Sequence, residues 1–484
     1  MAQRILNGDV LASHGNIAGR TALVSILEAG LRAADPYNNT RQLLQVEGRR
    51  LVLDRPEFEP RDAPLSGPLA IDLDDVDRIY VVGAGKGIQR MAKAIEDALG
   101  ERLTGGVVID KHDLPLELER IRVVYGAHPL PDEGCLEGCR QILALARTLT
   151  PRDLVFTVTG NGISSLLTLP APGVTLDDLR RVTHMMQIER GVPTGELNPI
   201  RNHLDQMKGG QITRALRPAQ VVHLLAWDCR DYDWLVGSNV WLHTLPDRST
   251  YAEAIAMLHK WDAWDDAPAS VRAHLSRGDA AAETMKRAEF DSGRQRIYGV
   301  MPESLGMLPT AAAKARELGF AAHHLLSGMH VEASQYAIVN TGIAHNVEAT
   351  GQPFEPPCAL INGGEMVVTV GKENGIGGRN QEFALAAATH IAGSPHIVVG
   401  SVDSDGTDGP GAQLVAGCED IPSLAGGIVD GYTVAEARER GVDLAEALRR
   451  HNATPALCAL DSGVIASHNI SMNDLTVTLI MGRK

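Results

Sequence analysis

The chain has 484 residues, of which 44% are hydrophobic and 22% are charged, with 49 glycines and 25 prolines. This composition excludes a disordered or fibrous protein, and the length exceeds one ordinary core, so two or more domains are expected. The formal net charge of −15 comes with no cluster of Lys and Arg, which excludes a nucleic-acid-binding surface.

The N-terminal residues lack the basic start and apolar stretch of a secretion signal, and no apolar run is long enough for a membrane span. We therefore expect a soluble, cytoplasmic protein without a membrane partner. The six cysteines form neither a disulfide framework nor a zinc pattern. Cys135 and Cys139 lie one helical turn apart, where they are interpreted as small apolar side chains.

Residues 78–109 are typical of a β–α–β unit. A short apolar run at 78–82 leads into a glycine turn, apolar residues then recur at helical spacing, and Gly100 ends the helix. Further strands are predicted at 106–109, 121–124 and 153–158. Strands that alternate with helices indicate a mostly parallel sheet, whose strand-to-helix loops gather along one edge.

Thr175 and Asp178 form a capping box before a helix predicted to run to Met186, and 221–227 is a further buried strand. The polar, alanine-rich stretch 261–295 is the candidate domain connection. A second alternating pattern follows. Its strands are expected at 296–300, 358–361, 366–370, 396–402 and 475–481, and its helices at 310–319, 380–390 and 433–450. The predicted domains are 1–285, of Rossmann type, and 286–484, a smaller α/β domain.

The loop 83–87 (GAGKG) lies between a strand and a helix N-terminus, where free N–H groups and the helix dipole favour an anion. A dinucleotide fingerprint is disfavoured because its third glycine falls on Ile88, and the Walker A spacing is absent. Gly83, Gly85 and Lys86 are therefore candidate phosphate ligands, and a tight turn with a solvated lysine is the alternative.

The loop 371–382 also joins a strand to a helix. It places Gly377, Gly378 and Arg379 at the helix start, where an arginine can hold phosphate oxygens with two parallel hydrogen bonds. A third loop, 403–410 (DSDGTDGP), carries Asp405 and Asp408, which suit Mg²⁺ binding or proton abstraction and also occur in ordinary Asx turns.

The chain resembles the glycerate 2-kinases, which combine a glycerate kinase-like domain with a C-terminal domain named for its MOFRL motif. The matching segments run over nearly the whole chain: 83–86 with 91–94, 128–133, 198–204 with 208–210, 246–250, 363–365, 377–382, 405–410 and 473–474. The resemblance implies an active site in a cleft between the domains and Mg-ATP-dependent phosphorylation of D-glycerate at its 2-hydroxyl. It also implies that Lys86, Arg379 and Asp405 are the essential residues.

Several segments depart from the family pattern. The family's S-G-G-G-S loop is T-G-N-G-I-S here, in which Gly160, Gly162 and Ser164 remain candidate phosphate ligands. The family's S-D-V-x-G-D and S-G-P segments are altered at 227–231 and 238–240, and an insertion follows Gly411. Trp227, Trp234 and Trp241 fall inside the altered stretch around these two segments, where they indicate either a reshaped substrate wall or core packing.

These observations favour a kinase that uses ATP and Mg²⁺ and acts on a small hydroxy acid. A homo-oligomer is compatible with them. Arg201 or Lys208 would bind the carboxylate of the acid. Asp408 and Asn473 are further substrate contacts, and Asp228 and Asp405 are the metal ligands. The alternatives are a family member that isomerises or binds a sugar acid without nucleotide, and an NAD(P)-dependent dehydrogenase, which Ile88 disfavours.

Overall fold

The computed structural model describes residues 3–112, 115–228, 231–238, 241–373, 375–409, 420–469 and 472–482. The chain forms two compact units. The central unit is Pro36–Pro302, and the terminal unit combines Met1–Asp35 with Glu303–Lys484. No helix of the described ranges is long and apolar enough to cross a membrane.

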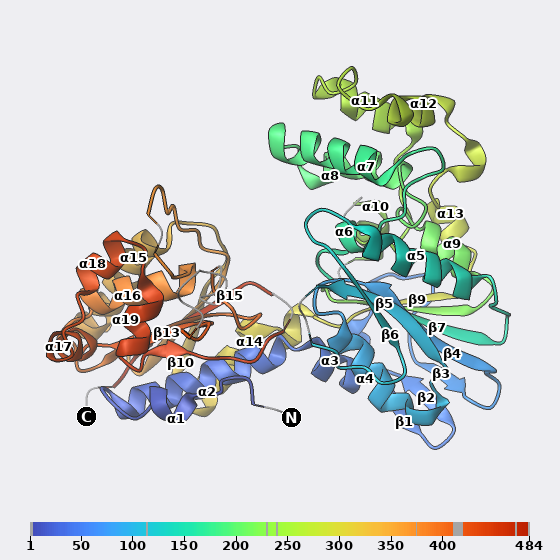
Figure 1. The fold of residues 1–484 in the computed structure, drawn as a ribbon. Helices are drawn as coiled ribbons and strands as arrows, with labels where there is room; N and C mark the ends of the chain where they lie inside the picture. The colour runs from blue at the N-terminus through green and yellow to red at the C-terminus, as the bar shows by residue number, and fades with distance from the viewer. Residues whose placement is uncertain are drawn as a thin grey trace. The chain divides into compact units, whose positions relative to one another are not determined.

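A six-stranded parallel sheet forms the core of the central unit (Figure 1). Its order is β6-β5-β4-β7-β8-β9, which is the strand order of a Rossmann fold. The strands are β4 (Arg78–Ala84), β5 (Gly105–Lys111), β6 (Arg122–Gly126), β7 (Asp153–Thr159), β8 (Gln220–Leu225) and β9 (Gln295–Gly299). β7 is buried along its whole length, as expected where helices cover both faces of a sheet.

The other helices of this unit lie around the sheet, and a small antiparallel sheet lies beside it (Figure 1). The helices are α3 (Pro36–Leu43), α4 (Gln89–Leu99), α5 (Glu133–Ala146), α6 (Ile163–Leu166), α9 (Gln211–Leu216), α10 (Tyr232–Gly237) and α13 (Arg287–Asp291). The small sheet contains β1 (Gln45–Glu47), β2 (Arg50–Leu53) and β3 (Leu69–Asp72). Short 3₁₀ turns occur at η1 (Pro56–Phe58), η2 (Gly100–Arg102) and η4 (Ala280–Ala282).

Four helices form a separate layer above the sheet, with an apolar cluster of their own (Figure 1). They are α7 (Leu176–His184), α8 (Thr194–His203), α11 (Tyr251–Lys260) and α12 (Ala269–Arg277). The predicted capping box of Thr175 and Asp178 is present at the start of α7. A π-helical turn, η3 (Met185–Glu189), follows α7.

The terminal unit contains a mixed six-stranded sheet of order β10-β11-β15-β12-β13-β14. Only β10 and β11 run parallel among the described pairs. The strands are β10 (Ala321–Met329), β11 (Cys358–Gly364), β15 (Asp474–Ile480), β12 (Ile397–Asp403), β13 (Gly426–Asp430) and β14 (Gly463–Val464). The helices are α1 (Gly8–Leu11), α2 (Ile17–Ala33), α14 (Met307–Glu317), α15 (Ala333–Thr350), α16 (Arg379–His390), α17 (Thr433–Glu439), α18 (Leu444–Arg449) and α19 (Ala453–Ala459), and η5 (Glu303–Leu305) precedes α14.

The N-terminal helix α2 belongs to the terminal unit because it packs directly on that sheet. Gly19 and Gly30 let the helix approach side chains of β12 and β15, and Leu23 and Leu27 lie against Gly400. The buried Arg20 forms an ion pair with Asp430 of β13, with Nε and Oδ2 2.5 Å apart.

The division of the chain differs from the predicted domains 1–285 and 286–484 at both ends. β9 begins at Gln295 and pairs with β8, so the strand expected to open the second domain completes the first sheet. The strand predicted at 366–370 is reduced to a single bridge between Glu332 and Val367. The segment lies beside α15 and not in the sheet, so it lacks ladder partners.

Candidate functional site

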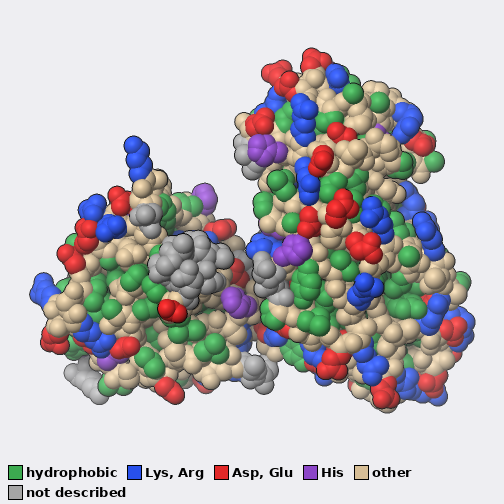
Figure 2. Space-filling model, in the orientation of Figure 1, with side chains coloured by type: hydrophobic (Ala, Val, Ile, Leu, Met, Phe, Trp, Pro, Cys, Tyr) green, Lys and Arg blue, Asp and Glu red, His purple; other side chains and the backbone are tan. Residues whose placement is uncertain are grey.

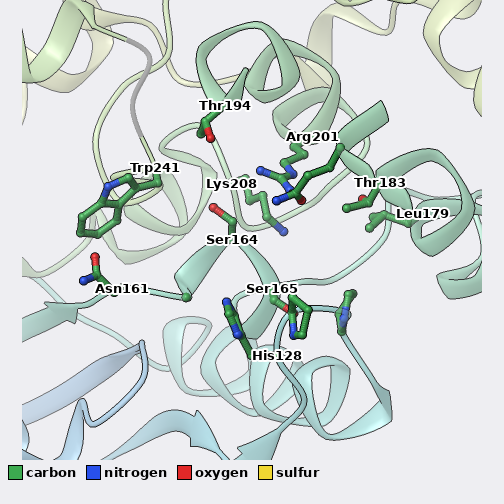
Figure 3. Close-up of a pocket in the computed structure, with 14 residues that line it drawn as sticks. His128, Asn161, Ser164, Ser165, Leu179, Thr183, Thr194, Arg201, Lys208 and Trp241 are labelled. Carbon is green, nitrogen blue, oxygen red and sulfur yellow. The ribbon is translucent and has the colours of Figure 1, made fainter. Parts of the chain in front are cut away.

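A cavity of about 200 Å³ lies in the central unit, beyond the carboxyl ends of β6 and β7 (Figure 3). Parallel sheets bind ligands at these ends, especially where the strand order reverses, which occurs here between β4 and β7. The cavity is lined by His128, Pro129, Pro131, Asn161, Gly162, Ser164, Ser165, Leu179, Thr183, Gln187, Thr194, Arg201, Lys208 and Trp241.

The two predicted glycine loops of the central unit pack against each other at this reversal. A Cβ on Gly85 would lie 2.6 Å from Cα of Gly160, so a side chain at Gly85 would clash with the backbone of the second loop. The backbone N–H of Lys86 donates to the carbonyl of Asn161 at 2.7 Å. The glycines therefore serve the close approach of the two loops.

The amides of the first loop are already used inside the protein. Those of Gly85 and Ile88 donate to backbone carbonyls, and that of Gly87 donates to Oδ1 of Asp110 at 2.8 Å. Asp110 is fully buried and takes the place expected for a bound anion. Burial raises the pKa of Asp110 to about 6, against the hydrogen bonds that it accepts. The amides of Gly85 and Gly87 thus have partners within the protein, and phosphate binding by Gly83 and Gly85 stays a prediction.

The side chain of Lys86 passes along the second loop, beside the ring of His128. A Cβ on Gly162 would lie 2.9 Å from Cγ of Lys86 and 3.1 Å from Cδ2 of His128. Burial, together with the charges of Lys86 and Lys111, lowers the pKa of His128 to about 4, so the ring is neutral near pH 7. Within the described ranges the Lys86 ammonium forms no hydrogen bond or ion pair, which leaves this cation for a ligand.

Arg201 of α8 reaches the cavity without an acidic partner. Its Nη2 donates to Oε1 of Gln187 at 2.7 Å, and no described carboxylate forms an ion pair with it. Burial alone lowers the pKa of Arg201 to about 10. Arg201 is half-buried, and a partly desolvated guanidinium without a counter-ion is a strong anion site.

Lys208 also lines the cavity, but its ammonium is bound within the protein. Nζ donates to the carbonyl of Leu167, to Oγ1 of Thr168 and to Oδ2 of Asp205, at 2.6 to 2.8 Å. An ammonium has three donors, and all three are occupied. Between the two predicted carboxylate ligands, Arg201 is therefore the one with free donors.

Ser164 and His243 form a hydrogen-bonded pair at the cavity wall. Oγ of Ser164 lies 2.8 Å from Nε2 of His243, which is fully buried. Burial, and the charges of Lys208 and Arg201, hold the pKa of His243 well below its ordinary value. The neutral imidazole fixes the rotamer of Ser164, whose oxygen faces the cavity (Figure 3).

One of the three tryptophans of the altered stretch contacts the cavity. Trp241 lines it, and the ring of Trp227 packs edge-on against Trp241 with 4.8 Å between centroids. Trp234 lies on α10, is 36% exposed and is not part of the lining. Of these three tryptophans, only Trp241 is placed to form part of a substrate-binding wall.

In the terminal unit, the predicted anion site at the start of α16 is also occupied by the protein. Asp408 accepts hydrogen bonds from the amides of Asn380 and Gln381, at 3.2 and 2.9 Å, and so caps the helix. Gly378 permits the close approach of this carboxylate. Burial raises the pKa of Asp408 to about 6. Gly378 thus lies against the carboxylate of Asp408, which caps the helix, and phosphate binding by Gly377 and Gly378 stays a prediction.

Arg379 is held by acidic side chains. Its Nε donates to Asp474 at 2.9 Å, its Nη2 donates to Asp403 at 2.7 Å, and Nη1 lies 3.4 Å from Oε1 of Glu365. Burial lowers the pKa of Arg379, but the hydrogen bonds and charges of Asp474 and the charge of Asp403 raise it above its ordinary value overall. These hydrogen bonds use Nε and one N–H of Nη2, so the two N–H groups of Nη1 and the second N–H of Nη2 remain for a ligand, and phosphate binding by Arg379 stays a prediction.

The remaining predicted residues lie at exposed or half-buried loop positions. Asp405 forms an Asx turn in which Oδ1 accepts from the amide and hydroxyl of Thr407. Asn473 is exposed, with φ 71°. Asp228 follows β8 in the central unit, whereas Asp405 belongs to the terminal unit. Among the described residues, no three His, Cys, Asp or Glu side chains gather as a metal site.

Comparison with known proteins identifies the family. Residues 22–276 match a domain of unknown function, DUF4147, and residues 358–473 match the MOFRL family. A glycerate 2-kinase of Pyrococcus horikoshii is 31% identical over 90% of this chain and 92% of its own length. The chain belongs to the glycerate 2-kinase family.

The solved structures extend this likeness to the fold. The crystal structure of a glycerate kinase from Thermotoga maritima covers 96% of this chain and 100% of its own, with 28% identity and a TM-score of 0.76. A D-glycerate 2-kinase of the same organism is 32% identical over 84% of this chain. As a member of the glycerate 2-kinase family, this protein is a phosphotransferase with an alcohol group as acceptor.

Several residues that shape the cavity were not among the site residues predicted from the sequence. They are His128, Thr183, Gln187, Thr194 and His243, with Asp110 behind the first loop. His128 carries a signal, because it follows a strand in a loop that matches the family. His243 and Asp110 carry none, since their roles arise from contacts between distant segments.

Proposed function

We propose that this enzyme transfers the γ-phosphate of ATP, with Mg²⁺, to the 2-hydroxyl of D-glycerate or a related sugar acid. The observation that carries the proposal is the pair of cations near one cavity, Arg201 and Lys86, which form no ion pair with a described carboxylate. Arg201 reaches the cavity, and Lys86 lies against Gly162 and His128 in its wall. Arg201 would bind the carboxylate of the acid, and Lys86 would hold phosphoryl oxygens.

Phosphoryl transfer relies mainly on positioning and electrostatic stabilisation, so few residues need to react covalently. Asp405 would orient or deprotonate the acceptor hydroxyl, and the Nη1 edge of Arg379 would offset charge in the transition state. The neutral ring of His128 lies beside the side chain of Lys86.

The proposed binding of Mg²⁺ follows the manner usual for kinases. Mg²⁺ keeps waters and binds substrate phosphates together with one or two carboxylates, so it needs no cluster of three acidic side chains. Asp228 and Asp405 are the proposed carboxylates. When bound, the ion would neutralise phosphate charge.

ADP release is the direct test. Purified enzyme is incubated with ATP, Mg²⁺ and D-glycerate or larger hydroxy acids, and the phosphorylated product is located by ³¹P NMR. We expect ADP release that requires both Mg²⁺ and an acid, with phosphate on the hydroxyl next to the carboxylate. Consumption of NADH with hydroxypyruvate, or conversion of an acid without nucleotide, would replace the kinase by one of the two alternatives.

A further inference from the structure

The charge balance of the cavity in the central unit points to a ligand with one negative charge. Lys208 is neutralised by Asp205, and His128 is uncharged near pH 7. No Asp or Glu is among the described lining residues, so Arg201 supplies the uncompensated charge of the lining, while Lys86 lies behind Gly162 and is assigned to the phosphoryl group by the proposed function. A guanidinium edge matches a carboxylate, because two parallel N–H groups meet two oxygens.

The rest of the lining offers hydroxyl and amide groups at several separate points. Gln187 accepts a hydrogen bond from Arg201. Thr183 stands near Arg201, and Asn161 stands on the opposite side, beside Trp241 (Figure 3). Ser164 lies between them, with its oxygen positioned by His243. Spaced neutral donors and acceptors recognise a row of hydroxyl groups.

The size of the cavity exceeds what glycerate needs. One water molecule requires about 10–15 Å³ of such volume. A cavity of about 200 Å³ therefore accommodates on the order of a dozen non-hydrogen atoms. Glycerate has fewer, whereas a linear pentonate or hexonate fits this range.

We propose that this cavity binds a linear, monoanionic sugar acid longer than glycerate, with its carboxylate on Arg201 and a hydroxyl on Ser164. The inference rests on the proposed function for the reaction, but the binding is independent of nucleotide. Trp241 and Asn161 contact the end of the chain remote from the carboxylate. Ser164 and Arg201 thus select the ligand by its hydroxyls and its single charge.

Isothermal titration calorimetry of the full-length protein without nucleotide tests the proposal. The panel contains D-glycerate, L-threonate, D-ribonate and D-gluconate, with sorbitol as the neutral analogue, glucarate as the dianion and hexanoate as the acid without hydroxyls. We expect ribonate or gluconate to bind at least about tenfold more tightly than glycerate, and sorbitol and hexanoate to bind weakly. Removing a hydrogen bond to a charged group costs about ten- to a hundredfold in affinity. Arg201→Met should therefore lower the affinity for the sugar acid by that factor.

Two further variants separate the roles of the residues. Ser164→Ala should lower the affinity for the sugar acid and leave the weak binding of hexanoate unchanged, because hexanoate has no hydroxyl group that could bond with Ser164. Arg181→Met removes an exposed arginine of α7 that is not in the lining, and it should bind like the parent. Thermal unfolding of each variant checks that it is folded.

The outcomes separate this proposal from the proposed function. Tightest binding of glycerate, equal weakening by Arg201→Met and Arg181→Met, or binding of sorbitol as tight as gluconate each overturns the sugar-acid site. If the enzyme then phosphorylated glycerate, and no longer-chain acid, with ATP, the proposed kinase function would still stand. If a sugar acid bound tightly through Arg201 but was not phosphorylated, the sugar-acid site would stand and the proposed kinase function would be overturned.

Discussion

Cγ of Lys86 lies 2.9 Å from the position that a Cβ on Gly162 would occupy. Gly162 also has φ 81°, in the left-handed region that favours glycine. Gly162→Ala should therefore displace Lys86 and lower turnover at least about tenfold, in addition to a backbone cost of about 1–2 kcal/mol. Gly173→Ala is the matched control, because Gly173 has φ 87° and open space around it. Equal loss of activity in both variants would show that backbone strain alone is responsible.

Lys86→Met should raise the pKa of His128 above about 4 without restoring 6.5, because burial is the larger cause and remains. NMR titration of the His128 ring measures this shift. Lys111→Met is the control and should raise the pKa less, since the charge of Lys111 has the smaller effect. An unchanged pKa in Lys86→Met would place the ammonium away from the ring. Turnover of this variant should fall about 10²–10³-fold.

Arg201→Met and Lys208→Met should differ in thermal stability. Lys208→Met leaves Asp205 buried without its cation and should cost about 3–5 kcal/mol. Arg201→Met removes a half-buried cation that has no carboxylate partner among the described residues, so its melting temperature should equal or exceed that of the parent. Calorimetry measures both. A large loss of stability in Arg201→Met would mean that the arginine serves the fold and not a ligand.

Arg379→Ala should destabilise the protein and not only remove activity. Asp403 and Asp474 are both buried and would lose their guanidinium, at a cost of about 3–5 kcal/mol. Arg379→Lys should recover a part of this, because a point charge cannot serve both carboxylates as the fork does. Chemical denaturation compares these variants with Arg438→Ala, in which an exposed arginine of α17 is removed. Stability equal to that of Arg438→Ala would contradict the ion-pair assignment.

Trp241→Phe should abolish any change of intrinsic fluorescence on acid binding, because Trp241 lines the cavity. Trp234→Phe should keep the full response, since Trp234 lies outside the lining. Emission spectra recorded during titration with an acid distinguish the two. A response that survives in Trp241→Phe and is lost in Trp234→Phe would move the ligand away from this cavity.

The visible face of each unit carries Lys, Arg, Asp and Glu side chains interspersed with one another (Figure 2). Recognition of a charged ligand therefore depends on local arrangements and not on a broad field of one sign. The proposed acid site is such an arrangement, since a single arginine decides its charge.

The parallel sheet of the central unit, its glycine loops and the helix after β4 were predictable from the sequence, because each depends on a local pattern. Short apolar runs, a tight turn and helical spacing ending at Gly100 predict β4 and α4 almost residue by residue. The family itself was also recognisable from ordered motifs.

The tertiary structure decided which charges are free. Asp110 and Asp408 fill the two helix N-termini at which phosphate was expected, and they reach them from segments 23 and 28 residues away. Similarly, β9 joins the first sheet through pairing with β8, although the intervening sequence looks like a domain connection. Local periodicity contains no information on such partners, because burial and pairing depend on segments that only folding brings together. Arg201 and Lys208 look equivalent in the sequence, and only the carboxylate of Asp205 distinguishes the structural cation from the one that awaits a ligand.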